Sequence, residues 1–156
     1  MLELSLLIFF PFLLAFAGAS DLFTMTISNR ISLALIAGFF GFAFWIGLSW
    51  QMMGMHLLAG LLMLTITFFM FTRGWMGGGD AKLASATALW FGFAHMLDYV
   101  LAASIFGGLL TLVLLQLRTL PLPAMLRGWE WAQRLHDKQT GIPYGIALSA
   151  AALAIY

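Results

Sequence analysis

Three aspartates lie directly beside long apolar segments, and they are the residues best suited to chemistry. They are Asp21, Asp80 and Asp98. Two carboxylates a few ångströms apart share one proton, because both cannot easily ionise together. The charged member of such a pair can activate a water molecule, and the protonated member can donate to a carbonyl oxygen. A pair of these acids would therefore suit the hydrolysis of a peptide bond.

The remaining composition argues against several rival chemistries. The chain contains no cysteine, which excludes thiol catalysis and cysteine-bound zinc. Its three histidines, His56, His95 and His136, lack the spacing of metal ligands. A net charge of +1 gives no basic face for nucleic acid. We therefore expect no metal, no cofactor and no nucleic-acid partner.

Hydropathy indicates which elements must position the acids. Hydrophobic residues make up 63% of the 156 positions and charged residues only 8%, whereas a soluble domain carries about 25% charged residues. The sequence therefore predicts an all-α, polytopic membrane protein with a single domain over residues 1–156. Six apolar segments approach the length that spans a bilayer. They are Leu2–Ala19, Ile31–Trp50, His56–Thr72, Ala81–Met96, Tyr99–Leu117 and Gly141–Tyr156.

The basic residues predict the orientation of these six transmembrane helices. Five connectors alternate between the membrane faces: 20–30, 51–55, 73–80, 97–98 and 118–140. All seven basic residues lie in, or directly after, the first, third and fifth connectors. The positive-inside rule then places those connectors in the cytoplasm, with the N-terminus and C-terminus outside. Asp21 and Asp80 would share the cytoplasmic face, and Asp98 would lie about 30 Å away at the outer face.

Two local features have alternative interpretations. Residues 17–19 resemble a signal-peptide cleavage site, although the preceding segment carries Glu3 and no basic residue. The connector 118–140 is amphipathic, and Pro121 and Pro123 prevent a continuous helix from the fifth span. It is expected to be an interfacial helix on anionic headgroups, or alternatively a surface that handles a partner.

The residues around each acid also favour more than one structure. The run Gly77–Gly79 lets a substrate strand approach closely and permits positive φ angles. Asp80 would then begin a helix, whose dipole favours a carboxylate. Alternatively, the glycines form a flexible turn and Asp80 is an N-cap. After Asp21, Ser28 and Asn29 can cap the second span.

Together these features resemble the type IV prepilin peptidases, a family of intramembrane aspartic proteases. The element Ile27-Ser28-Asn29 after Asp21 is similar to the family's hydrophobic-Pro-Asn element, with serine in place of proline. The family's G-x-G-D motif resembles Gly77-Gly78-Gly79-Asp80, which Ala81-Lys82 follows. The motif that opens the family's last span resembles Ile142-Pro143-Tyr144-Gly145.

The resemblance implies that Asp21 and Asp80 are the catalytic residues. It implies supporting roles for Asn29, Gly77, Gly78, Gly79, Lys82, Pro143, Tyr144 and Gly145. The family cuts the basic leader from pilin precursors at the cytoplasmic face of the cell membrane, usually after glycine. The implied partner is thus a prepilin-like precursor inserted in the lipid bilayer.

The chain looks like the short branch of this family, which is seen with tight-adherence (Flp-type) pili and in preflagellin processing. Members that also methylate the new N-terminus carry a cytoplasmic region with zinc-binding cysteine pairs. This sequence has no cysteine. The resemblance therefore implies an aspartic endopeptidase without N-methyltransferase activity.

Two other functions remain open. Asp21 and Asp80 could form the relay of a small proton-coupled transporter or channel subunit. That function needs a further polar residue near the membrane midplane, and the neighbouring spans offer Thr65, Thr67, Ser85 and Thr87. The other function is a non-catalytic assembly partner with a degenerate site, and the presence of both acids counts against it.

Overall fold

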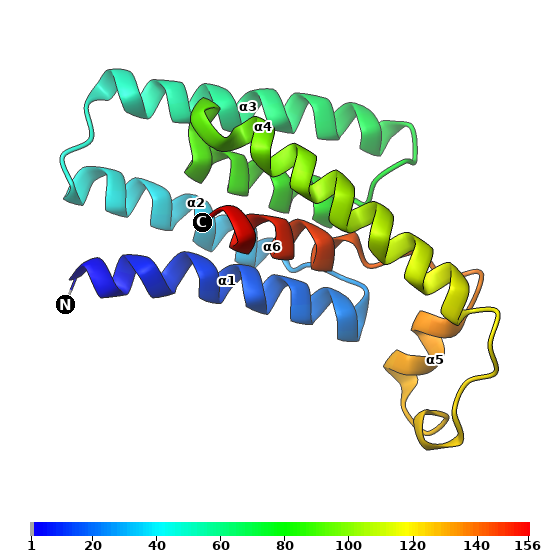
Figure 1. The fold of residues 1–156 in the computed structure, drawn as a ribbon. Helices are drawn as coiled ribbons and strands as arrows, with labels where there is room; N and C mark the ends of the chain where they lie inside the picture. The colour runs from blue at the N-terminus through cyan, green and yellow to red at the C-terminus, as the bar shows by residue number, and fades with distance from the viewer. Residues whose placement is uncertain (1) are drawn as a thin grey trace.

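The computed structural model describes residues 2–156, with side chains from Ile8 onward. Within that range the chain forms six α-helices and one 3-10 turn, and no strand (Figure 1). The elements are α1 (Leu2–Thr24), α2 (Asn29–Trp45), α3 (Trp50–Thr72), α4 (Gly78–Leu117), η1 (Ala124–Leu126), α5 (Glu130–His136) and α6 (Tyr144–Ile155). The all-α prediction is therefore confirmed.

Serine caps fix where the second and third helices begin. Ser28 accepts a hydrogen bond from the Arg30 N–H, which confirms that it caps the second predicted span. Ser49 caps α3 in the same way, and Gly47 just before it has a φ of 67°. The predicted position of the second connector, 51–55, is therefore wrong, because the chain turns at residues 46–49 and residues 51–55 are helical.

The chain reverses direction inside α4, at Gly92 (Figure 1). Gly92 has φ 59° and ψ −167°, a conformation that essentially only glycine adopts. It divides α4 into a first segment (78–91) and a second segment (93–117), whose Phe91 and Tyr99 rings lie 5.5 Å apart. The predicted connector 97–98 is wrong, since both residues are helical. The single glycine lies among apolar residues, so hydropathy gave no break there.

The core surrounds the first segment of α4. Leu83 from this segment is fully buried with Leu14 of α1, Leu35 of α2 and Ala151 of α6. Alanines on α4 and α6 let these helices approach closely. Figure 1 shows α6 lying between α1 and α4, and it packs against both. The first segment of α4, which carries Asp80 in its first turn, is thus the most enclosed part of the described residues.

The outer surface of the helices is strongly apolar. Large exposed side chains include Phe12, Leu61, Phe68, Ile105 and Leu112, and an apolar surface of this kind suits lipid rather than water. Both α3 and α4 are long and apolar enough to cross a membrane. The 12-residue α6 rises only about 18 Å, less than the hydrocarbon core of about 30 Å. Six membrane crossings therefore remain a prediction.

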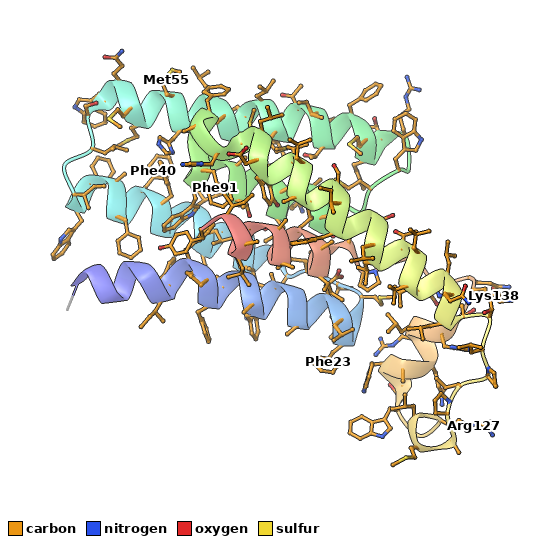
Figure 2. All side chains as sticks on the ribbon, viewed as in Figure 1. Phe23, Phe40, Met55, Phe91, Arg127 and Lys138 are labelled. Atoms are coloured by element: carbon orange, nitrogen blue, oxygen red, sulfur yellow. The ribbon has the colours of Figure 1, made fainter. Side chains whose placement is uncertain are left out.

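The basic residues gather at one end of the bundle. Arg30 is the second residue of α2, Arg73 follows α3, and Arg118 follows α4. Figure 2 shows Arg127 and Lys138 at this same end, where α1 finishes. The short helix α5 lies here too. We call this part of the molecule the basic end.

Replacing Gly92 by alanine should destabilise the protein. A side chain at this φ and ψ costs about 1–3 kcal/mol, and the added Cβ would lie 3.0 Å from the His56 ring. We expect a lower thermal unfolding midpoint in detergent. Gly108→Ala is the matched control, because Gly108 is helical and its Cβ would meet nothing within 4 Å. Equal midpoints for the two variants would contradict the reversal at Gly92.

Candidate active site

Asp21 and Asp80 line one cavity of about 410 Å³ at the basic end. Asp21 is in the last turn of α1 and is 5% exposed, and Asp80 is in the first turn of α4 and is 9% exposed. Both acids therefore border the same space. We call this space the acid cavity; its other lining residues are Met25, Gly74, Trp75, Met76, Gly77, Thr140, Gly141, Ile142, Pro143 and Tyr144.

Asp98 is not part of this cavity. Its exposed carboxylate lies 3.6 Å from the exposed ring of His95 on the second segment of α4. Topology had predicted that Asp21 and Asp80 could meet and that Asp98 could not. The structure brings the predicted pair together and leaves the third acid outside. Among the described residues, no group of three or more potential metal ligands occurs.

The backbone of α6 holds the Asp21 carboxylate. The Gly145 N–H donates a 2.7 Å hydrogen bond to Asp21 Oδ2. Gly145 is the second residue of α6, where backbone N–H groups lack partners within the helix and the dipole favours an anion. A Cβ on Gly145 would lie 2.7 Å from the same carboxylate oxygen. Glycine is therefore needed here so that helix and carboxylate can meet.

Asp80 is held by the start of its own helix. The N-cap of α4 is Gly77, and Asp80 is the third helical residue, so the predicted N-cap role for Asp80 is wrong. Its carboxylate instead lies against Gly77, at the N-cap of the same helix. The start of α4 thus positions Asp80 at the acid cavity.

The glycines before Asp80 provide space. The sequence suggested that these glycines permit positive φ angles, but none of the three has a positive φ. That part of the prediction is wrong. A Cβ on Gly77 would lie 2.9 Å from Asp80 Oδ2. A Cβ on Gly79 would lie 3.1 Å from the Ile27 Cβ of the first connector. The run therefore lets the start of α4 pack closely against the connector that follows Asp21.

A side-chain hydrogen bond joins the same two parts of the chain. Lys82 Nζ donates to Asn29 Oδ1 at 2.8 Å. Lys82 is exposed in the second turn of α4, and Asn29 is the first residue of α2, so this bond links the two helices near their starts. Both residues were identified from sequence only as parts of motifs. Their contact explains why residues so far apart in the chain accompany the two acids.

Pro143 and Tyr144 fix the start of α6. Pro143 is its N-cap, and Tyr144 is its first residue, as the sequence motif predicted. The Tyr144 hydroxyl lies 3.1 Å from the Thr111 hydroxyl on the second segment of α4. Its ring packs close to Gly107, where an added Cβ would lie 3.3 Å away. These contacts place the Gly145 N–H at Asp21.

Two arginines attach the connector 118–140 to the bundle. Arg118, 8% exposed, donates to the carbonyl oxygens of Leu135 at 2.8 Å and Gly141 at 2.9 Å. Arg134 donates to the Phe23 carbonyl at 2.9 Å. The predicted interfacial helix is only the seven-residue α5, which packs against α1. Sequence reasoning missed these contacts, because backbone acceptors leave no mark in the sequence.

Replacing Arg118 by methionine should loosen the wall of the acid cavity. Each lost hydrogen bond to a charged group contributes about 1.5–3 kcal/mol, so amide exchange over residues 134–142 should accelerate at least about tenfold. Hydrogen exchange with mass spectrometry measures this. Arg127→Met is the control, because the Arg127 guanidinium donates to the Leu122 carbonyl within its own segment and not to residues 134–142. Unchanged amide exchange over residues 134–142 in Arg118→Met would show that the two Arg118 hydrogen bonds do not hold this segment in place.

Comparison with known proteins places the chain in a family. The model of the type IV leader peptidase family matches residues 8–112. This match includes both acids, Asn29, the glycine run and Lys82, and it ends before the motif at 142–145. No similar curated protein and no similar solved structure was found. Because the match covers more than half of the sequence and confirms the resemblance, the chain belongs to the type IV leader peptidase family.

Proposed function

We propose that this chain is an aspartic endopeptidase that cleaves the leader peptide of type IV pilin-like precursors of the Flp type. Its family makes it a peptidase, and its long apolar helices indicate a membrane protein. The observation that carries the aspartic mechanism is the acid cavity, where Asp21 and Asp80 meet from different helices. A further support is that no basic side chain is among the described residues that line this cavity. A salt bridge there would keep both acids ionised.

In the proposed reaction the two carboxylates share one proton. The ionised carboxylate removes a proton from water, and the water oxygen attacks the scissile carbonyl carbon. The protonated carboxylate gives its proton to the carbonyl oxygen, so that a gem-diol forms. In the collapse of the gem-diol the C–N bond breaks, the pair protonates the leaving nitrogen, and one hydroxyl of the gem-diol returns its proton to the pair. The Gly145 N–H keeps the Asp21 carboxylate in position through these steps.

The distribution of charge supports a cytoplasmic active site. The acid cavity is at the basic end, and the positive-inside rule places that end in the cytoplasm of a cell-membrane protein. The two segments of α4 would then be the fourth and fifth of six spans, with both termini outside. A basic leader would remain in the cytoplasm, and the apolar part of the precursor would lie in the bilayer.

The absence of cysteine from this sequence supports the short branch of the family. The zinc-binding cysteine pairs that accompany methyltransferase activity have no counterpart among these residues. We therefore propose cleavage without methylation of the new N-terminus. Mass spectrometry of the processed precursor distinguishes the two products.

Replacing either acid by asparagine should abolish processing. Asn cannot act as the general base or exchange the shared proton, so we expect at least about a 100-fold loss in cleavage of a co-expressed Flp-type precursor. Asp98→Asn is the matched control and should cleave normally, because Asp98 is outside the cavity. Wild-type cleavage by Asp80→Asn would disprove the mechanism. A different result would favour a transporter: the wild type does not cleave the precursor but conducts protons, and both Asp21→Asn and Asp80→Asn lose this proton flux.

Gly145→Ala should lower cleavage while the protein still folds. The added Cβ would push the Asp21 carboxylate from its backbone partner, and a hydrogen bond to a charged group contributes about 1.5–3 kcal/mol. We expect cleavage to fall by roughly 10-fold to 100-fold in a precursor assay. Gly128→Ala should have no effect, because a Cβ there meets nothing within 4 Å. If both variants cleave equally, the Gly145 contact does not position Asp21.

A further inference from the structure

A second cavity of about 390 Å³ adjoins the acid cavity. It lies between α3, both segments of α4 and α6. Met76 and Tyr144 line both cavities, so the two spaces meet at these side chains. We call the second space the methionine groove, after Met63, Met70, Met76 and Met96 in its lining.

The lining of the methionine groove suits an apolar helix. Methionine side chains are flexible and polarisable, and they adapt to irregular apolar partners. The second segment of α4 adds small residues to the lining, among them Ala103, Gly107 and Gly108. A Cβ on Gly108 would meet nothing within 4 Å, so the groove has free room at this point.

The groove is open to the surroundings and extends away from the acids. Ile66, Ser104 and Gly108 in its lining are exposed. From Met70 to Met63 it follows α3 for about 10 Å, roughly two helical turns. An apolar segment could therefore enter from the bilayer and leave its end at the acid cavity.

A larger groove on the other side of α4 does not reach the acids. It has a volume of about 450 Å³ and lies between α2, α3 and the first segment of α4. Among the described residues, its lining and that of the acid cavity have no member in common. A substrate chain whose peptide bond is held at the acid cavity would therefore continue into the methionine groove and not into this larger groove.

We infer that the methionine groove binds the apolar helix of the substrate, on the C-terminal side of the scissile bond. This inference rests on the proposed function. The scissile bond lies extended in the acid cavity, and the helix begins past Tyr144 and Met76. The apolar face of the substrate helix then packs against the methionines and the small residues, as in other helix-in-groove complexes.

Cysteine crosslinking tests this location directly. Because the chain has no cysteine, Ser104→Cys introduces a single thiol in the groove. The Asp80→Asn background keeps the precursor intact. The probe is an Flp-type precursor with one cysteine in the second turn of its apolar helix, linked by a short bismaleimide in a bilayer. Thr65→Cys is the matched control, because both hydroxyls are exposed, both donate to the carbonyl four residues earlier, and Thr65 lines neither groove.

We expect a crosslink with Ser104→Cys that excess precursor without cysteine suppresses, and little with Thr65→Cys. Equal crosslinking at both positions, or none at Ser104→Cys while the wild-type enzyme cleaves the probe, would overturn the inference. The latter result would mean that the groove holds only lipid. Failure of the wild-type enzyme to cleave the probe would instead count against the proposed function.

A second variant separates helix binding from chemistry. Gly108→Leu should fill the free room in the groove and raise KM for the full precursor about tenfold. Cleavage of a short peptide that ends just past the scissile bond should be unchanged. Gly41→Leu on α2 is the control, because its Cβ also meets nothing within 4 Å and it lines neither groove. An equal effect of Gly108→Leu on both substrates, or no effect on either, would contradict the inference.

Discussion

Two carboxylates must be buried at the end of an apolar helix bundle, and the surrounding structure reflects this constraint. Burying a charge is unfavourable unless hydrogen bonds compensate it. The compensation comes from helix starts: the Gly145 N–H of α6 donates to Asp21, and Asp80 lies in the first turn of α4. A helix N-terminus stabilises an anion without supplying a full positive charge. The acids can therefore be held in place without a basic side chain among the described residues that line their cavity.

This arrangement explains features that are otherwise unusual for an apolar bundle. The helix α6 is short, yet it lies between α1 and α4, because it must bring its first turn to Asp21 (Figure 1). Glycines occur where an acid meets a helix start, since a Cβ at Gly77 or Gly145 would collide with a carboxylate oxygen. Arg118 donates to the carbonyl oxygen of Gly141, and Gly141 lines the same cavity. This hydrogen bond therefore holds the end of the last connector beside the acids.

The sequence allowed the fold class and the acid pair to be predicted for physical reasons. An apolar chain with so few charged residues is typical of helices in lipid, because helices satisfy their own backbone hydrogen bonds. The clustering of basic residues predicts which ends of the apolar segments lie together. The reversal between the two segments of α4 was predicted at residues 97–98 instead of at Gly92, because a single glycine among apolar residues does not alter hydropathy. The role of Gly145 was missed because the donor is a backbone group. Its motif was recognised, but the partner, Asp21, is far away in the chain.

The central claim is that Asp21 and Asp80 face each other in the membrane-embedded protein. It is tested most directly by replacing both with cysteine in this cysteine-free chain and adding a short thiol crosslinker in a bilayer. Trypsin separates the two positions by cutting after Arg30 and Arg73, so mass spectrometry identifies a linked peptide pair. We predict efficient crosslinking of this pair and none when Asp21→Cys is combined with Asp98→Cys. Absence of the first crosslink, or equal yields for the two pairs, would contradict the account.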